Sequence, residues 1–243
     1  MPALVHPGIR AAAWRRAHER PRRGLPVRTI RPVTTPETPT RGTRLPRSAR
    51  RSQLLGAAQE VFVAQGYHCA AMDDIAERAG VSKPVLYQHF PSKLDLYLAL
   101  LDQHSAELLG AVHGALSATT DNKTRVAAVI AAYFEFVDRD GEPFRLVFES
   151  DLANDTSVRE RVDAVTRACA QAIAEVIRED AGLPAEEAEL LAVALAGMAQ
   201  VSARYWITQG RQIPREAADR LVFQLSWRGI RGFPKVSTVA AKG

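Results

Sequence analysis

Cysteine is nearly absent from this 243-residue chain, which contains only Cys69 and Cys169. Two thiols supply neither a disulfide framework nor a set of metal ligands, so we expect both to be packed thiols in a reducing cytoplasm. His68 beside Cys69 does not indicate a nucleophile pair, because neighbours in sequence rarely point at one another. We predict no catalytic residue and no metal site.

Other patterns are missing as well. The chain has no strand-type alternation, no internal repeat and no glycine-rich phosphate loop. No apolar segment followed by a small-residue cleavage site lies near the start, so no secretion signal is expected. The uncharged run between Glu189 and Arg204 is shorter than the roughly 18–20 residues that cross a bilayer. We therefore expect a cytoplasmic protein without membrane segments.

Acidic residues are scarce in the first 47 residues, which hold eleven arginines, no lysine and only Glu19 and Glu37. The net charge of the whole chain is only +5, so the rest is net acidic. The first 46 residues also contain eight of the 14 prolines, which predicts a disordered basic arm over 1–46. The arm either adds salt-dependent contacts to DNA phosphates or is a dispensable leader. Residues 232–243 are expected to form a flexible tail.

Apolar residues at helical spacing cover most of the remaining chain. A first helix is expected over 48–65, ended by Gly66. A capping box from Ser92 to Asp95 opens a long helix whose apolar stripe runs from Leu94 to Leu116. Further helical elements are expected near 123–138, 144–148, 158–181, 185–208 and after Pro214. The sequence predicts an all-α fold of about nine helices.

Residues 72–93 are typical of two short helices joined by a tight turn. Asp73 and Asp74 suit the positive end of the first helix. Gly80 allows the positive φ that a sharp turn requires. Ser82 is expected to cap the second helix, and Pro84 is tolerated in its first turn. This pattern predicts a helix-turn-helix.

The second helix of this motif has one apolar side and one polar side. Val81, either Val85 or Leu86, and Phe90 are expected to face inward. Lysine and tyrosine can reach DNA phosphates, while serine, glutamine and histidine can bind base edges in a major groove. On this pattern alone, a buried helical hairpin with a solvated face is the alternative.

The residues Asp-Ile-Ala, Ala-Gly-Val-Ser, Leu-Tyr, His-Phe and Ser-Lys, at their spacing within 74–93, resemble the DNA-binding motif of the TetR family of bacterial regulators. The family usually has two threonines where this chain has Ala70 and Ala71. The resemblance implies a three-helix DNA-binding domain over 47–92 and a helical ligand-binding and dimerisation domain over 93–231. The residues expected to contact DNA are Arg50, Met72, Ser82, Lys83, Pro84, Val85, Tyr87, Gln88, His89 and Lys93.

The segments 81–98, 119–122, 145–149 and 203–206 are similar to those of actinobacterial regulators of fatty acid synthesis within that family. This resemblance implies an activator of the fatty acid synthase operon that binds a palindromic operator as a homodimer. It implies no cofactor, and an effector, long-chain acyl-CoA, that weakens DNA binding. Apolar residues expected to line the ligand site are Leu101, Leu108, Val112, Phe134, Val137, Phe144, Phe148, Cys169, Ile173, Met198 and Trp206.

The sequence also offers arginines for the CoA phosphates and small residues for close helix packing. The arginines available for CoA phosphates are Arg125, Arg145, Arg159, Arg161, Arg167 and Arg204, and the sequence does not select among them. Small residues that let helices come close are Ala192, Ala194, Ala196, Gly197, Ala199 and Ala203. They suit a dimer interface, the alternative being core packing within one subunit.

Two other functions fit the same sequence less well. A TetR-type repressor that senses another hydrophobic metabolite or a drug would bind DNA equally well and ignore acyl-CoA. A lipid carrier would use the same cavity but would not need Lys83, Tyr87 and His89 exposed.

Overall fold

Helices make up almost all of the computed structural model that is described, namely residues 45–139, 146, 152 and 154–229. Within those ranges there are eight helices and no strand, which confirms the predicted all-α class. The predicted arm, apart from its last two residues, and the predicted tail lie outside them. The element expected at 144–148 also lies outside, except for Leu146, which is buried.

The first helix, α1 (Arg47–Cys69), packs an apolar side into the core through Leu54, Ala58 and Phe62. Gly66 has a φ of 75° and interrupts the helical backbone. A single further turn after it completes α1. The predicted stop at Gly66 is confirmed, because a positive φ of this kind suits glycine.

Two short helices follow, α2 (Met72–Arg78) and α3 (Lys83–His89). Gly80, between them, has a φ of 64°. Its amide donates to the carbonyl of Glu77 at 2.9 Å, and the amide of Val81 donates to Ala76 at 3.0 Å. These bonds close the end of α2 and turn the chain into α3, as the sequence predicts. We refer to α1, α2 and α3, the three helices expected to bind DNA, as the head.

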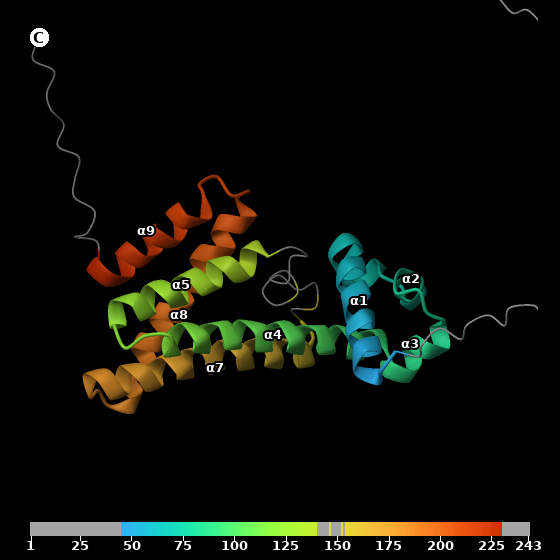
Figure 1. Ribbon diagram of the computed structural model, residues 1–243, viewed down its shortest axis with the longest axis horizontal. Coiled ribbons are helices and arrows are strands. Elements are labelled where there is room, and N and C mark those ends of the chain that lie inside the picture. The colour runs from blue at the N-terminus through green and yellow to red at the C-terminus, as the bar shows by residue number, and fades with distance from the viewer. Residues whose placement is uncertain (1–44, 140–145, 147–151, 153, 230–243) are drawn as a thin grey trace, which may run out of the picture. The chain divides into compact units, whose positions relative to one another are not determined.

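Helix α4 (Lys93–Ser117) follows the head and connects it to the remaining helices. The Ser92 hydroxyl accepts a hydrogen bond from the amide of Asp95 at 3.0 Å, which confirms the predicted cap. The stripe predicted on this helix is buried from Tyr97 to Leu116. Figure 1 shows α4 passing from α1 to a position alongside α5 and α7.

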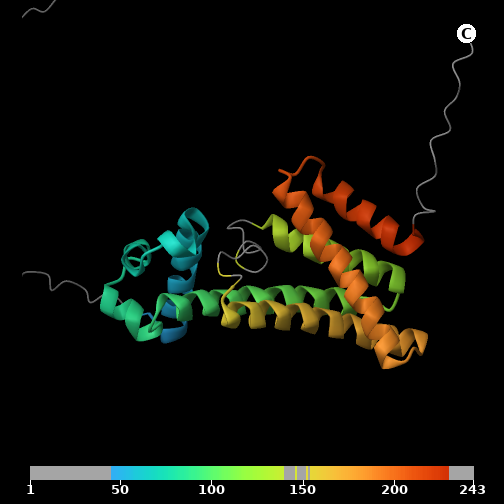
Figure 2. The ribbon, with the colours of Figure 1, turned by 180° about the vertical axis from the view of Figure 1, so that it is seen from behind.

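Four more helices follow: α5 (Asn122–Asp138), α7 (Thr156–Ala181), α8 (Ala185–Thr208) and α9 (Arg215–Arg228). Helices α5 and α7 pack against α4, and α9 packs against α5 and α8. Asp121 caps α5 and Asp155 caps α7, each through a side-chain oxygen that accepts backbone amides. Helix α7 ends at Gly182, which has a φ of 64°. Helix α8 contacts α5, α7 and α9, and Figure 2 shows it crossing in front of α5.

The small residues of α8 face in two directions. Ala192, Ala196, Ala199 and Ala203 are buried by this chain alone, whereas Ala194 is exposed and Gly197 is half-buried. The four buried alanines therefore pack within one subunit, and their assignment to a dimer interface was wrong. Their small size lets α8 approach its neighbours closely.

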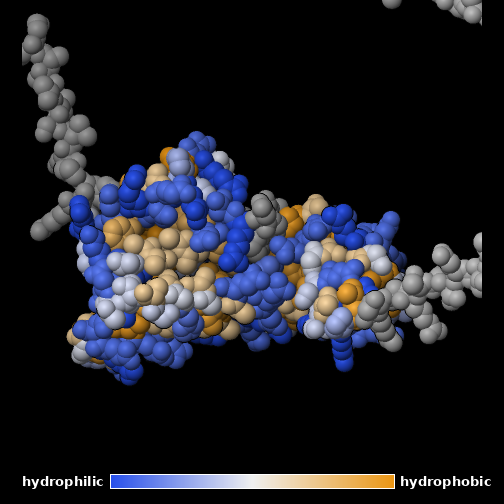
Figure 3. Space-filling view, viewed as in Figure 1, coloured by the Kyte–Doolittle hydropathy of each residue, from blue (hydrophilic) through white to orange (hydrophobic). Residues whose placement is uncertain are grey.

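Length and apolar composition alone would let α8 cross a membrane. Core helices of soluble proteins share these properties, and α8 contacts three other helices of this bundle. Seen from the side of Figure 1, apolar surface gathers over α5 between the polar edges of α4 and α9 (Figure 3).

Candidate nucleic-acid interface and ligand pocket

Helix α3 presents a continuous polar face to solvent. Phe90 is buried, as predicted, and of the two alternatives Leu86 is the buried residue. Val81 is only half-buried. Val85 and His89 are half-buried at the edge of the helix. The exposed members, which we call the recognition face, are Ser82, Lys83, Pro84, Tyr87 and Gln88. This face combines groups that bind phosphates with groups that bind base edges.

Neither helix of the motif is capped by a side chain. The carbonyl of Ser82 accepts bonds from Val85 and Leu86, but its hydroxyl makes no capping bond, so the predicted cap at Ser82 was wrong. Ala71, which precedes α2, has no side-chain oxygen to offer. The Ser82 hydroxyl is therefore exposed and not occupied by a cap.

Lys83 is held by an ion pair across the turn. Its Nζ lies 2.7 Å from Oδ1 of Asp73, at the start of α2, and both side chains are exposed. The hydrogen bond and the charge of Asp73 raise the pKa of Lys83 above its usual value. A phosphate that approaches Lys83 must compete with this carboxylate.

The start of α1 lies beside the end of α3. Arg50 donates to Oε1 of Gln53 at 2.7 Å, and Gln53 in turn donates to the carbonyl of Ala79 at 2.7 Å. The guanidinium of Arg51 lies 4.5 Å from the centre of the Phe90 ring. Desolvation, followed by the charges of the nearby arginines, lowers the pKa of His89 below its usual value. These arginines extend the positive surface beyond the recognition face.

Two residues predicted to contact DNA have other surroundings in the structure. Met72 is buried at the start of α2. The ammonium of Lys93 lies within 2.8 Å of the carbonyl oxygens of Tyr67 and Ala70 and 3.3 Å from that of His68. It also lies 4.5 Å from the centre of the Tyr67 ring. The donors of Lys93 are thus directed into the head, and its contact with phosphate stays a prediction.

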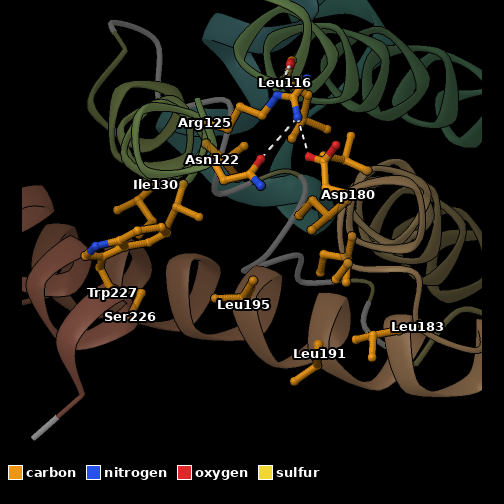
Figure 4. A pocket seen from close by; sticks show the side chains of 16 residues that line it. Leu116, Asn122, Arg125, Ile130, Asp180, Leu183, Leu191, Leu195, Ser226 and Trp227 are labelled. Carbon is orange, nitrogen blue, oxygen red and sulfur yellow. Dashed lines mark hydrogen bonds and ion pairs between the residues drawn. The ribbon is translucent and has the colours of Figure 1, made fainter. Parts of the chain in front are cut away.

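A largely apolar pocket of about 420 Å³ lies among five helices and the Leu183 loop. Its walls come from the end of α4, the first half of α5, the second half of α7, and parts of α8 and α9. In Figure 4, Trp227 lies beside Ile130 on one side, and Leu195 projects from α8. The apolar lining residues are Leu116, Val126, Val129, Ile130, Ile173, Val176, Ile177, Ala181, Leu183, Leu191, Leu195 and Trp227. We call this the Arg125 pocket.

Arg125 supplies the polar edge of this pocket, and two of its three side-chain nitrogens are hydrogen-bonded within the chain. Its Nε donates to the carbonyls of Leu116 and Thr119 at 3.0 and 2.7 Å. Its Nη1 lies 2.6 Å from Oδ2 of Asp180 and 3.1 Å from Oδ1 of Asn122 (Figure 4). The guanidinium therefore ties α4, α5 and α7 together, and a phosphate that approached it would compete with Asp180.

The residues predicted to line the ligand site separate into groups. Ile173 lines the Arg125 pocket. Leu101, Leu108, Val112, Val137 and Cys169 are buried, and Met198 is half-buried. Phe134 and Trp206 line a second hollow of about 710 Å³ formed with α9. Phe144 and Phe148 lie outside the described residues.

Most residues that line the Arg125 pocket were not among those predicted from the sequence. Val126, Val129 and Ile130 carry the same apolar period as core positions of α5, and the sequence does not say where the core is incompletely filled. The signal that was available is the position of helix ends, since α4 ends and α5 begins on either side of Thr119 and α7 ends at Ala181.

Helices α8 and α9 carry large apolar side chains that this chain does not cover. Val201 and Tyr205 are each 67% exposed, and Leu190 is 71% exposed. The set, which we call the α8–α9 apolar face, comprises Leu190, Leu191, Val193, Val201, Tyr205, Leu221, Leu225 and Trp227. An exposed apolar area of this kind is typical of a surface that another protein covers.

Among the residues that the structure describes, no group of three or more histidine, cysteine, aspartate or glutamate side chains could hold a metal ion. Cys169 is buried, as expected, but Cys69 is exposed, so the expectation of a packed thiol was wrong for Cys69. Burial raises the pKa of the Cys169 thiol. It raises the pKa of the Tyr133 hydroxyl still further. Both groups are therefore neutral at physiological pH.

Comparison with known proteins matches both halves of the chain. Residues 54–100 match the family described as bacterial regulatory proteins, tetR family. Residues 122–229 match the family described as tetracyclin repressor-like, C-terminal domain. The chain is 48% identical over 194 residues to the HTH-type transcriptional activator FasR of Mycolicibacterium smegmatis, covering 80% of this chain and 89% of FasR.

Solved structures have the same fold. A tetR-family transcriptional regulator from Streptomyces coelicolor is 30% identical, with a TM-score of 0.61 over 75% of this chain and 82% of that one. The transcriptional regulator FadR from Bacillus subtilis, solved in complex with stearoyl-CoA, is 20% identical, with a TM-score of 0.63 over 74% of this chain and 98% of that one. At this identity the FadR likeness concerns the fold.

Proposed function

The chain belongs to the TetR family of bacterial transcriptional regulators, and on this basis we propose that it activates fatty acid synthesis genes and leaves DNA when long-chain acyl-CoA binds. The family predicted from the helix-turn-helix motif is confirmed. The observation that carries the proposal is the identity of 48% to the activator FasR, which spans most of both chains.

DNA recognition belongs to the recognition face of α3. Lys83 binds phosphate, and Tyr87 contacts either phosphate or a base edge. Ser82 and Gln88 bind base edges, and the arginines at the start of α1 bind the backbone beside them. These assignments follow from exposure and chemical type, because charged groups bind phosphates while amides and hydroxyls also bind base edges.

The active species is a homodimer on a palindromic operator. A helix-turn-helix reads two half-sites roughly 34–36 Å apart through a two-fold dimer. The α8–α9 apolar face is the surface that a second copy covers, because it is large, apolar and uncovered by this chain. Cytoplasmic localisation accompanies a function on chromosomal DNA.

The acyl chain of the effector occupies the Arg125 pocket. Its volume of about 420 Å³ falls in the range of roughly 300–1,000 Å³ that is common for small-molecule sites. Each buried methylene stabilises the complex by about 0.8 kcal/mol, so the apolar lining favours a long hydrocarbon chain. The fold can hold such a ligand, since the FadR structure contains stearoyl-CoA.

The phosphates of CoA bind outside this pocket. Arg125 is committed to Asp180 and to two carbonyls, and Arg161 donates to Asp102 at 2.8 Å. Arg159 and Arg167 are exposed on α7, and Arg145 lies outside the described residues.

Fluorescence anisotropy on the upstream DNA of the host's fatty acid synthase gene tests the proposal. At fixed salt, palmitoyl-CoA and stearoyl-CoA should release the DNA, and free CoA should not. Ile177→Trp, which fills the pocket, should weaken this response. Val162→Trp is the matched control, because Val162 is equally half-buried on α7 but does not line the pocket.

Three results would contradict the proposal in different ways. Tight DNA binding without release by either acyl-CoA would favour the alternative, a TetR-type repressor that senses another hydrophobic compound. The absence of sequence-specific binding to this DNA would refute the operon assignment. Release by acyl-CoA that Ile177→Trp leaves unchanged would place the acyl chain elsewhere.

A further inference from the structure

His104 is the buried polar side chain of the region that the structure describes. It lies on α4 and is only 4% exposed, surrounded by an otherwise apolar core. Burial of a polar ring is costly unless its nitrogens find partners. The partners of His104 therefore indicate why a histidine occupies this core position.

Both ring nitrogens have a partner, and the two partners lie on different helices. Nδ1 lies 3.1 Å from Oε2 of Glu107, one turn further along α4. Nε2 lies 3.1 Å from Oε1 of Gln59, on α1 of the head. A protonated ring donates to both oxygens. A neutral ring keeps both bonds if the amide of Gln59 turns to present its NH2 group. The bridge thus exists in either protonation state.

Glu107 extends this bridge to α5. Nη1 of Arg139, at the end of α5, lies 3.1 Å from the same Oε2 that faces His104. Partial burial opposes ionisation of Glu107, but hydrogen bonds from Gln103 and His104 and the charge of Arg139 together hold its pKa below the usual value. Glu107 is therefore a carboxylate at neutral pH and can accept from both neighbours.

The opposite end of α5 lines the Arg125 pocket. Val126, Val129 and Ile130 of this helix form its wall. Hydrogen bonds join the successive turns of a helix, so we take a shift of one end of α5 to be passed on to Arg139, the residue that directly follows its last turn. A ligand that displaces the first half of α5 therefore also displaces Arg139. The series from Arg139 through Glu107 and His104 to Gln59 connects this displacement to the head.

A second arginine on the bundle provides a contrast. Nε of Arg161, on α7, lies 2.8 Å from Oδ1 of Asp102 on α4. This pair resembles the pair of Arg139 and Glu107 in chemistry and lies on the same stretch of α4. Its described hydrogen bonds stay on α4 and α7, and none reaches the head.

We propose that His104 is the positioning residue that couples α5 to the head, through Glu107 and Arg139 on one side and Gln59 on the other. The effector in this inference rests on the proposed function, whereas the series of contacts from Arg139 to Gln59 does not depend on it. His104 touches neither DNA nor the pocket. It fixes α1 relative to α5, and the setting of α1 determines where the recognition face of α3 lies.

A double-mutant cycle tests the connectivity without any ligand. Operator DNA is first selected from random sequence with the wild-type protein, so the test does not depend on the identity of the operon. The dissociation constant of this DNA is then measured for wild type, Gln59→Ala, Arg139→Gln and the double variant. Arg139 is exposed, so its replacement does not threaten folding.

The two substitutions should be non-additive by roughly three-fold or more, since linked residues couple whereas independent ones add. The control cycle pairs Gln59→Ala with Arg161→Gln and should be additive. In a His104→Phe background, the coupling between Gln59 and Arg139 should disappear. Additivity of Gln59 and Arg139 in the wild-type background would overturn the proposal.

A second measurement separates coupling from mere stabilisation. The ratio of operator dissociation constants with and without palmitoyl-CoA should fall at least about five-fold in His104→Phe, within the usual range of allosteric couplings. A residue with a purely structural role would change both constants equally and leave the ratio unaltered, which would also refute the proposal. If palmitoyl-CoA does not release the wild-type protein, the effector assignment fails, and the cycle still decides the connectivity.

Discussion

Lys93 donates a hydrogen bond of 2.8 Å from its ammonium to the carbonyl oxygen of Ala70, which joins the first turn of α4 to the chain just before α2. The same ammonium reaches the carbonyl of Tyr67. The lysine thus satisfies carbonyls at the end of α1 that have no helical partner.

Replacing this lysine should destabilise the head. Lys93→Met keeps the aliphatic stem and leaves these carbonyls without their charged donor, which should cost about 1–3 kcal/mol of unfolding free energy. Chemical denaturation measures this loss. Stability equal to wild type, together with a salt slope of DNA binding smaller by about one unit, would instead identify a direct contact to phosphate.

Tyr87 should matter for DNA binding and not for folding, because it is 41% exposed on the recognition face. Tyr87→Ala should weaken operator binding by roughly 10- to 100-fold, the usual cost of one specific contact, and leave the melting temperature unchanged. Tyr87→Phe separates the hydroxyl from the ring. Unaltered affinity in Tyr87→Ala would remove this residue from the interface and revive the lipid carrier.

Asp73→Asn should strengthen DNA binding. The carboxylate repels phosphates and occupies Lys83, so its neutralisation frees the ammonium for DNA. We expect a few-fold tighter binding and a steeper dependence on salt concentration. Asp74→Asn is the matched control, since it removes the same charge from the neighbouring exposed position. An equal effect of both substitutions would show that only the general charge matters.

Val201→Lys should yield a monomer. Val201 belongs to the α8–α9 apolar face and is 67% exposed, so a charge there would lie in a dimer interface without a partner, which is costly. Sedimentation velocity measures the change of mass, and Gln171→Lys, on the exposed side of α7, serves as the control. A dimer that persists in Val201→Lys would move the interface to another surface.

The two thiols should react differently. Cys69 is exposed, whereas Cys169 is buried and burial raises the pKa of its thiol. Native protein should therefore titrate one thiol rapidly with a disulfide reagent at mildly alkaline pH, and denatured protein should titrate two. Because the unfolded thiol ionises at lower pH than the folded one, Cys169 also reduces stability as the pH rises above its unfolded pKa. Rapid reaction of Cys69→Ser would show that Cys169 is accessible in the native state.

Local chemistry made much of the fold predictable. Gly80 and Gly66 take the positive φ that their positions require, and Ser92 caps α4 as its spacing to Asp95 indicates. Helix bounds followed from apolar periods and from such stops, so α8 was predicted at 185–208 and lies there. These signals depend on residues within one or two turns of each other.

Tertiary relationships were harder to predict. Ser82 is a good capping residue in general, yet its hydroxyl makes no capping bond. The alanines of α8 fit a core as well as an interface, and only the packing of α7 and α5 against them decides between the two. The Arg125 pocket arises where helix ends meet and leave volume unfilled. That volume depends on the relative positions of five helices, which no local pattern contains.

The contacts between the head and α4 restrict where DNA-binding modules can be exchanged between such regulators. A splice at Ser92, where the sequence suggests a domain boundary, would separate the head from Lys93 and from the His104 that Gln59 meets. A chimera that retains residues up to Glu107 keeps both of these contacts. The DNA specificity of such a chimera should therefore depend on the position of the junction in α4. A chimera whose junction lies before Glu107 should contain the donor's three head helices but should not hold them in the donor's orientation.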